Sequence, residues 1–322
     1  MNIDSIYTLI SDDMKQVNAT ILKRLQSEIV LINQVGTHII NSGGKRLRPV
    51  IHLLCARAIG YSGVQHIDIA AIIEFIHTAT LLHDDVVDAS DLRRGQETAN
   101  SLWGNEASVL VGDFLYSRAF QMMVDVGDMQ IMSILANATN TIAEGEVQQL
   151  LNVHDPETTE QRYLDVIHNK TAKLFESASE LAAILGQQDS EAQKAMAKYG
   201  MHLGTAFQLI DDVLDYSASS EEMGKNIGDD LAEGKPTLPL IYTIQNGTKE
   251  QADMVRKAIE ENGLDYIDAV TEAIQATGAI DYTADCAKKE SQLAIAALEN
   301  VANSEYKTAL IDLAKFAVHR KF

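Results

Sequence analysis

The sequence predicts an all-α fold. Apolar residues recur at helical spacing through long stretches such as AIIEFIHTATLLHDDVVD and YGMHLGTAFQLIDDVLDY. The chain has only 4 prolines, so these stretches carry no helix breaker. No stretch shows a convincing alternation of apolar and polar residues, and the Asn246-Gly247 pair lies between helical segments rather than between strands. We therefore expect helices along the whole chain.

The expected helices are these periodic stretches, taken in order along the chain. The first six cover residues 3–33, 46–60, 66–89, 106–125, 129–152 and 160–186. The remaining six cover residues 190–217, 237–247, 250–262, 265–276, 283–302 and 304–319. The longest loops between them are polar or glycine-containing, namely NSGGK, DASDLRRGQET, NVHDPETT and SASSEEMGKNIGDDLAEGKPT. Because none of these loops resembles a disordered linker, we expect a single domain over residues 1–322.

Composition and charge restrict the class of protein. With 322 residues, of which 46% are hydrophobic, the chain can bury a sizeable core and is typical of a globular protein. The formal net charge of −20 argues against nonspecific binding to nucleic acid, because a phosphate backbone would be repelled. The two cysteines, Cys55 and Cys286, are far apart in the chain and favour a reducing compartment.

The sequence also lacks signals for secretion or for spanning a membrane. The N-terminal stretch MNIDSIYTLISDDMK has no basic region followed by an apolar core. The most apolar stretch, IDIAAIIEFIHTATLL, is interrupted by polar residues and is too short to span a bilayer. We therefore expect a cytoplasmic protein with no transmembrane segment.

Two copies of the pattern Asp-Asp-x-x-Asp stand at the ends of mostly apolar stretches. Asp84 and Asp88 are four residues apart, as are Asp211 and Asp215, so a helix places each pair on one face, about 6 Å apart along its axis. Like charges at this spacing destabilise a helix and resist ionising together. Mg²⁺ relieves such repulsion and typically takes one or two carboxylates together with phosphate oxygens and waters.

Either motif alone is better interpreted as a solvated helix face. Two copies on interior helices instead favour a cavity with acidic walls, which is how helical bundles build metal sites. A hydrolytic metal centre based on the His83-Asp84 pair is an alternative, with His52 and His77 as further ligands. That alternative leaves the second acidic motif and the basic residues unexplained.

Basic residues near both acidic motifs suit phosphate groups. The stretch GGKRLRP places three cations after a glycine pair, where a helix begins and favours anions. Taken singly, any of the cations could be solvated or held in a surface ion pair. Together with the acidic motifs they predict sites for two diphosphates, one held through Mg²⁺ and one held directly. These cations are Lys45, Arg46, Arg48, Arg93, Arg94, Lys170, Lys225 and Lys235.

The order and spacing of several motifs resemble the trans-type polyprenyl diphosphate synthases over nearly the whole chain. The matching stretches are GGKRLRP, EFIHTATLLHDDVVD, LRRG, VGDFLYSRAF, IAEGEVQQL, NKTAKLFE, GTAFQLIDDVLDY and GKNIGDDLAEGKPTLPL. The resemblance implies an isoprenoid synthase helical bundle around a central catalytic cavity, and a homodimer. It implies chain elongation of an allylic diphosphate, farnesyl diphosphate, with isopentenyl diphosphate to supply the side chain of ubiquinone.

The resemblance also implies a role for each matching residue. Mg²⁺, as three ions when diphosphate is bound, would be held by Asp84, Asp88 and Asp211, with Asp85 and Asp215 in support. The allylic diphosphate would contact Arg93, Lys170, Lys225 and Lys235. Isopentenyl diphosphate would contact Lys45, Arg48, His77 and Arg94. The developing allylic cation would lie beside Thr171 and Gln208, and the site would be closed by Arg320 and Lys321.

His77 has an alternative interpretation. It lies seven residues before Asp84 on the same helix stripe, so it fits a hydrogen-bonded core histidine as well as a substrate contact.

Small side chains before the first acidic motif bear on product length. Ala79 and Thr80 lie about one helical turn before Asp84, where the resemblance implies that the growing chain passes. Because they leave this space open, we expect a deeper floor and a long product, about C40. Ordinary core packing explains each candidate for the floor equally well. These candidates are Phe120, Met122, Met123, Met132 and Leu135.

Two other classes of protein are alternatives to a polyprenyl diphosphate synthase. A class I terpene cyclase would share the first acidic motif but would carry a second metal motif containing Asn or Asp, Ser or Thr, and Glu. A non-catalytic partner subunit of a prenyl synthase would lack one of the two acidic motifs, and both are present here. We also expect the protein to contact a membrane peripherally when it releases its product.

Overall fold

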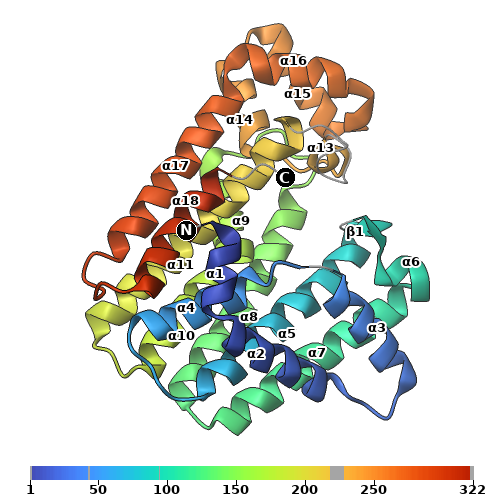
Figure 1. Ribbon diagram of the computed structural model, residues 1–322. Helices are drawn as coiled ribbons and strands as arrows, with labels where there is room; N and C mark the ends of the chain where they lie inside the picture. The colour runs from blue at the N-terminus through green and yellow to red at the C-terminus, as the bar shows by residue number, and fades with distance from the viewer. Residues whose placement is uncertain (1, 43, 94, 218–227, 320–322) are drawn as a thin grey trace. The chain divides into compact units, whose positions relative to one another are not determined.

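The computed structural model describes residues 2–42, 44–93, 95–217 and 228–319 (Figure 1). These residues are helical almost throughout, so the expectation of an all-α fold is confirmed. Turns and loops join the helices, and the strands that the described residues form are β1 (Leu92–Arg93) and β2 (Gln96–Glu97), which pair as a short antiparallel hairpin. The hairpin lies in a stretch expected to be a loop, and Gly95 at its turn has a φ of 73°, which glycine adopts without strain. Two-residue strands are too short to show alternation in the sequence.

The expectation of one helix over residues 3–33 is wrong. The structure has three helices here, α1 (Ile3–Leu9), α2 (Ser11–Leu25) and α3 (Val30–Asn41). Between α2 and α3 the side chain of Asn33 accepts a hydrogen bond from the backbone N–H of Ser27 at 3.0 Å and donates one to its carbonyl at 2.7 Å. These bonds replace helical backbone bonds and turn the chain, because an asparagine side chain competes with the backbone for partners.

The next helices anchor the first acidic motif. Helices α4 (Leu47–Ala58), α5 (Gln65–Val87) and α7 (Asn105–Val126) end within two residues of the expected bounds, and the short α6 (Ala99–Trp103) was not expected. α5 packs against α2, α4 and α7. Its residues Ile69, Ile72 and Ile76 are completely buried. Burial of each such side chain stabilises the folded state by about 1.5–3 kcal/mol. The last turn of α5, which carries the acidic residues, is therefore fixed to this core.

The helices around the second acidic motif match the expectations well, with one interruption. Helices α8 (Met129–Asn152) and α11 (Ser190–Ser217) have the expected bounds. The expected helix over residues 160–186 is divided into α9 (Glu160–Ile167), one turn of π-helix, η1 (His168–Ala172), and α10 (Lys173–Leu185). A turn of π-helix inside an α-helix is frequent at functional sites.

The remaining helices form the C-terminal part of the chain. Their bounds differ from the expected ones by a few residues, and the two shortest lie in stretches expected to be loops or helix ends. They are α13 (Asp229–Ala232), α14 (Leu238–Asn246), α15 (Lys249–Glu260), η2 (Gly263–Tyr266, a 3₁₀ turn), α16 (Ile267–Thr277), α17 (Ala279–Ala297) and α18 (Glu305–Val318). None of the described helices is long and apolar enough to cross a lipid bilayer.

The chain divides into two compact units. Unit 1 comprises residues 1–139, 174–200 and 297–313, and unit 2 comprises residues 140–173, 201–296 and 314–322. Unit 2 has two buried apolar clusters, one centred on Val255 and Ile274 and the other on Tyr163 and Leu209. The division falls within α8, α10, α11, α17 and α18, so neither unit is a contiguous stretch of sequence. The expectation of a single domain stays a prediction.

Candidate functional site

The first acidic motif lies at the C-terminal end of α5. Asp84 and Asp88 are both partly exposed, and Asp88 caps the helix, its N–H donating to the carbonyl of Asp84 at 2.8 Å. A helix C-terminus is the negative end of the helix dipole, so two carboxylates here repel both each other and the helix end. This arrangement is poor for stability but suits the binding of a cation.

Asp85 has a different environment from its two neighbours. It is completely buried, and its Oδ1 accepts from Nη2 of Arg93 at 2.6 Å and from Nε at 2.7 Å. Burial raises the pKa of Asp85, and the hydrogen bond and charge of Arg93 oppose that rise. The contact in the structure is thus with Arg93, which β1 brings back toward the end of α5.

Two of the residues expected to bind isopentenyl diphosphate lie together. Nη1 of Arg48 is 3.0 Å from Nε2 of His77, and the Arg48 guanidinium lies over the ring of Phe175 at 4.5 Å from its centroid. Lys45 is exposed, and its carbonyl accepts a hydrogen bond from the Tyr7 hydroxyl. The fourth expected residue, Arg94, lies outside the described residues.

Arg46, the remaining cation of GGKRLRP, has a structural role. Its side chain forms an ion pair with Glu74 at 3.4 Å and donates to the carbonyl of Ile40 at 3.3 Å. Arg46 therefore connects the loop that precedes α4 to two helices, α3 and α5.

The residues expected to set product length are all in unit 1. Ala79, Met123 and Leu135 are buried, with at most 1% of their surface exposed. Thr80 is partly exposed, and its hydroxyl donates to the carbonyl of His77 at 2.7 Å. Core packing would bury the same residues, so their role in product length stays a prediction.

A π-helical turn places Lys170 and Thr171. A Cβ atom at Gly145 of α8 would lie 2.8 Å from the backbone nitrogen of Lys170, closer than real contacts allow. Only glycine lets α8 approach η1 this closely. Nζ of Lys170 contacts a carboxylate oxygen of Glu146 at 2.5 Å and donates to Oε1 of Gln149 at 2.8 Å. The amine of Lys170 is thus held against α8 by Glu146 and Gln149.

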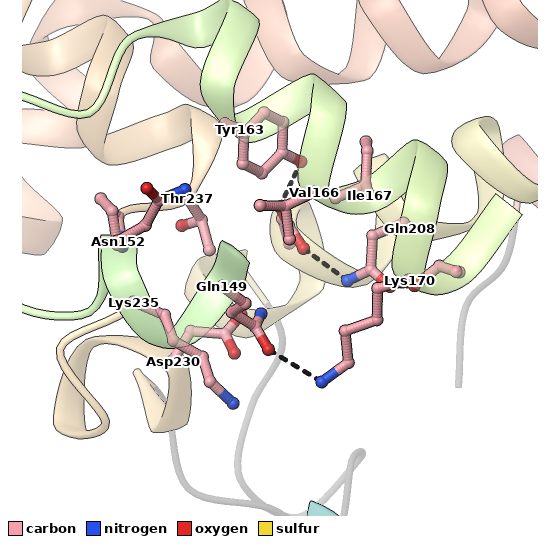
Figure 2. Close-up of a pocket in the computed structure, with 13 residues that line it drawn as sticks. Gln149, Asn152, Tyr163, Val166, Ile167, Lys170, Gln208, Asp230, Lys235 and Thr237 are labelled. Carbon is pink, nitrogen blue, oxygen red and sulfur yellow. Dashed lines mark hydrogen bonds between the residues drawn. The ribbon is translucent and has the colours of Figure 1, made fainter. Parts of the chain in front are cut away.

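Four expected site residues line one pocket of about 160 Å³, which lies within unit 2. They are Lys170, Thr171, Gln208 and Lys235. Figure 2 shows the amine ends of Lys170 and Lys235 on the same side of Gln149. Lys235 also forms an ion pair with Glu233. The expected Lys225 lies outside the described residues, as do Arg320 and Lys321.

A chain of hydrogen bonds crosses this pocket. The Tyr163 hydroxyl donates to Oδ2 of Asp212 at 2.5 Å, and Nε2 of Gln208 donates to Oδ1 of Asp212 at 2.9 Å. Oε1 of Gln208 accepts from the Thr171 hydroxyl at 3.2 Å. Neither Tyr163 nor Asp212 was expected among the site residues. Asp212 was visible as the second aspartate of its motif, whereas nothing in the sequence pairs it with Tyr163.

The second acidic motif resembles the first in the burial of its first two aspartates and differs in its third, since Asp215 is buried where Asp88 is partly exposed. Asp211 is partly exposed and Asp212 is 1% exposed. Asp215 is also buried, and its carboxylate accepts from the backbone N–H of Asp230 at 3.3 Å. Burial and the charge of Asp230 raise the pKa of Asp215 to about 8, and the same two causes raise the pKa of Asp212 well above its usual range.

The carboxylates of each acidic motif, taken separately, suit a cation bound together with an anionic ligand. Among the described residues, no group of three or more His, Cys, Asp or Glu side chains could hold a metal ion alone. Mg²⁺ does not require such a group when it is shared with a phosphate, because one or two carboxylates then suffice. Asp84 with Asp88, and Asp211, meet that requirement.

Comparison with known families and proteins gives one consistent result. A model of the polyprenyl synthetase family matches residues 29–277. The chain is 54% identical over 321 residues to octaprenyl diphosphate synthase of Escherichia coli strain K12, covering 99% of both chains. It is 53% identical to the enzyme of the same name from Haemophilus influenzae, covering 100% of this chain and 98% of that one.

A relative of another product length is more distant. The nonaprenyl diphosphate synthase of Rhodobacter capsulatus, described as specific for geranyl diphosphate, is 46% identical over 97% of this chain and 96% of its own.

Solved structures agree with this result. A polyprenyl synthase from Caulobacter crescentus, complexed with calcium and isoprenyl diphosphate, has a TM-score of 0.96 and 44% identity, covering 100% of this chain and 98% of its own. A decaprenyl diphosphate synthase from Rhodobacter capsulatus has a TM-score of 0.93 and 43% identity, covering 99% of both chains.

Proposed function

The chain belongs to the polyprenyl synthetase family, and from this premise we propose that it extends farnesyl diphosphate with isopentenyl diphosphate to all-trans octaprenyl diphosphate. As a member of the family it is a prenyltransferase that elongates all-trans prenyl chains. The octaprenyl length is supported by the relatives of 53–54% identity, since the nonaprenyl relative is less similar at 46%. We propose that the product supplies the side chain of ubiquinone.

The carboxylates suit Mg²⁺ as the cofactor. We propose that three Mg²⁺ ions are bound when the allylic diphosphate is present. Asp84 and Asp88 would hold them from α5 and Asp211 from α11, and the charge of the ions would stabilise the departing diphosphate. Asp85 supports this site through Arg93, and Asp215 supports it by fixing the backbone of Asp230.

The allylic diphosphate contacts the cations beside the acidic motifs. These are Arg93, Lys170, Lys225 and Lys235. Lys170 and Lys235 both line the same pocket (Figure 2). Their charges favour binding of the diphosphate group before the C–O bond breaks and stabilise the released diphosphate afterwards. The leaving group therefore departs into a site already prepared for its charge.

Isopentenyl diphosphate binds near the start of α4. Its diphosphate contacts Lys45, Arg48, His77 and Arg94. Arg48 is held in place by stacking on Phe175 and by its contact with His77, which reduces the entropy lost on binding.

The reaction proceeds through loss of the allylic diphosphate. The C–O bond to diphosphate breaks, and the double bond of isopentenyl diphosphate attacks the resulting allylic cation to form the new C–C bond. A proton then leaves the adjacent carbon, with the departed diphosphate as its acceptor. The oxygens of Thr171 and Gln208 stabilise the cation electrostatically, and exclusion of water protects it from hydrolysis.

The observation that carries this proposal is the pocket in which Lys170, Thr171, Gln208 and Lys235 meet. The test is to incubate purified protein with Mg²⁺, farnesyl diphosphate and radiolabelled isopentenyl diphosphate, and to separate the products by chromatography. Octaprenyl diphosphate is the expected main product. Cyclised hydrocarbon would indicate a terpene cyclase, and activity only after a second protein is added would indicate a partner subunit.

We also propose that the protein is a cytoplasmic homodimer of single-domain protomers. Each unit exposes large apolar side chains that a second copy could cover. In unit 1 these include Leu110 at 66% and Val124 at 62% exposure, and in unit 2 Val147 at 59% and Leu151 at 72%. Exposed apolar surface of this kind marks interaction sites, including peripheral contact with a membrane during product release. Light scattering during size exclusion would measure the assembly.

A further inference from the structure

Gln208 is held at both ends of its amide. Its nitrogen donates to Asp212 on the next turn of α11, and its oxygen accepts from Thr171 of η1. We propose that Asp212 is a positioning residue which, together with Tyr163, fixes the end of the Gln208 amide that faces Thr171. This inference rests on the proposed function, in which Gln208 and Thr171 lie beside the allylic cation.

The donors and acceptors along this chain of bonds permit one orientation of Gln208. The two oxygens of Asp212 accept from two different donors: Oδ2 from the hydroxyl of Tyr163 and Oδ1 from the amide nitrogen of Gln208. If the amide were reversed, its oxygen would face an Asp212 oxygen at about the same 2.9 Å, which is repulsive. Asp212 therefore directs the Gln208 nitrogen toward itself and the oxygen toward Thr171.

The hydroxyl of Tyr163 requires a hydrogen-bond acceptor from the side chain of residue 212. Among the described residues, Asp212 is the acceptor for the Tyr163 hydroxyl, and both side chains are at most 5% exposed. A buried hydroxyl without an acceptor costs about 1–3 kcal/mol. Tyr163 therefore requires an oxygen on its side of residue 212, even if that residue is changed to asparagine.

The orientation of Gln208 matters for the charge near the reacting carbon. A carbonyl oxygen carries partial negative charge and stabilises an adjacent cation, whereas an NH₂ group destabilises it. Reversing the amide would therefore raise the energy of the cation-like transition state without removing any contact to a diphosphate. We expect a fall in kcat with KM unchanged for both substrates.

Isosteric substitutions can reverse the amide and then restore it. In Asp212→Asn, the hydroxyl of Tyr163 donates to the new amide oxygen, so the new NH₂ group is directed toward the nitrogen of Gln208. Two NH₂ groups cannot bond to each other, so the side-chain amide of Gln208 should rotate by 180°. In the double variant Asp212→Asn/Gln208→Glu, the asparagine NH₂ donates to one glutamate oxygen and the other oxygen accepts from Thr171. The double variant thus restores every bond of the chain and keeps one carboxyl group and one amide at these two positions.

An equivalent pair elsewhere in the chain provides the control. Gln161 donates to Asp165 on α9 with the same four-residue spacing and the same 2.9 Å distance, but at the surface. The single and double variants Asp165→Asn and Gln161→Glu should leave kcat within about twofold of wild type, because exposed bonds contribute little. This control separates the hydrogen-bond chain from the general effect of exchanging an acid and an amide.

The experiment measures kcat, KM for each substrate, and Tm for all the variants. We expect Asp212→Asn to lower kcat roughly tenfold to a hundredfold with KM within about twofold, and the double variant to recover most of this loss. Gln208→Glu alone is the second single variant, and a double variant as slow as the losses of Asp212→Asn and Gln208→Glu combined would overturn the proposal. A wild-type kcat in Asp212→Asn would overturn it as well.

Two further readouts separate the possible failures. If Asp212 were a metal ligand, excess Mg²⁺ would restore Asp212→Asn and the second substitution would not, which would also overturn the proposal. Tm tests the bonds without any turnover, so a lower Tm in each single variant should recover in the double variant. If the wild-type protein did not elongate chains, the proposed function would fail while this pattern of Tm values still held.

Discussion

At the residue scale, the two acidic motifs are alike in their first two aspartates. In each, the first aspartate is partly exposed and the second is buried against a side chain that the proposed mechanism needs. Asp85 is buried against Arg93, and Asp212 is buried against Gln208. The spacing of the motifs in the sequence predicted which carboxylates share a helix face, but not which of them turn inward. Burial depends on neighbours that are distant in sequence, such as Tyr163.

Removing one exposed aspartate from either motif should abolish most turnover. We expect Asp84→Ala and Asp211→Ala each to lower kcat about a hundredfold or more, because each removes a carboxylate from the proposed Mg²⁺ site. Circular dichroism should show unchanged helicity, since both side chains lie partly in solvent. Asp281→Ala, at an exposed aspartate in the first turn of α17, is the control. Rates near wild type in excess Mg²⁺ would refute the metal assignment.

Breaking the ion pair of Asp85 should affect one substrate selectively. Asp85→Asn leaves Arg93 without its charged partner, so the guanidinium should lose its fixed orientation. We expect KM for the allylic diphosphate to rise roughly tenfold, with KM for isopentenyl diphosphate unchanged. Steady-state kinetics with each substrate varied in turn would measure both values.

A second ion pair in unit 1 supplies the control for Asp85→Asn. Asp13 accepts two hydrogen bonds from Arg57, at 2.7 and 2.8 Å, and is also buried. Asp13→Asn should lower Tm without changing KM for either substrate. Equal effects of the two variants on KM would mean that Asp85 acts on stability alone.

At the element scale, the sequence predicted long periodic helices better than interruptions. The bounds of α8 and α11 were predicted correctly because their apolar spacing is unbroken. The break after α2 was missed because it depends on the side-chain bonds of Asn33. The π-turn η1 was missed because it depends on contact with Gly145 of another helix. Such contacts between elements have no periodic signature in the sequence.

The close contact at Gly145 should be necessary for activity. In Gly145→Ala the added Cβ would lie 2.8 Å from the backbone nitrogen of Lys170, so α8 and η1 must separate. We expect kcat to fall roughly tenfold, because Lys170 and Thr171 would move with η1. Single-turnover and steady-state kinetics would measure this loss.

A helical glycine in unit 1 supplies the control for Gly145→Ala. In Gly36→Ala the added Cβ would meet the flexible end of Leu25, so the neighbour can adjust. That variant should change Tm without lowering kcat. If Gly145→Ala kept the wild-type kcat, the precise placement of η1 would not matter for the reaction.

At the scale of the whole molecule, residue chemistry was easier to predict than geometry. The net charge of −20 made local clusters of cations conspicuous, and they led to Arg48, Lys170 and Lys235. The structure brings Lys170 and Lys235 into one pocket with Thr171 and Gln208, although these residues come from η1, from α11 and from the loop before α14. The polar partners in that pocket, such as Asp230, became visible only when the chain was folded.

Product length is a property of the whole molecule, because it depends on how far a chain can extend through the core. Ala79 is completely buried in α5, one helical turn before Asp84. In Ala79→Tyr the ring would occupy the space that we expect the growing chain to use. The product should therefore become several isoprene units shorter while the rate of the first addition remains near wild type, as chromatography of radiolabelled products would measure.

Stability provides an independent check on the same space. Ala71 is also completely buried in α5, and Ala71→Tyr should overpack the core and lower stability by about 1–3 kcal/mol. Ala79→Tyr should lower Tm much less, because a path for the growing chain can accept the ring. An unchanged product together with an equal loss of stability in both variants would show that Ala79 borders ordinary core, and the floor would then have to be sought elsewhere in unit 1.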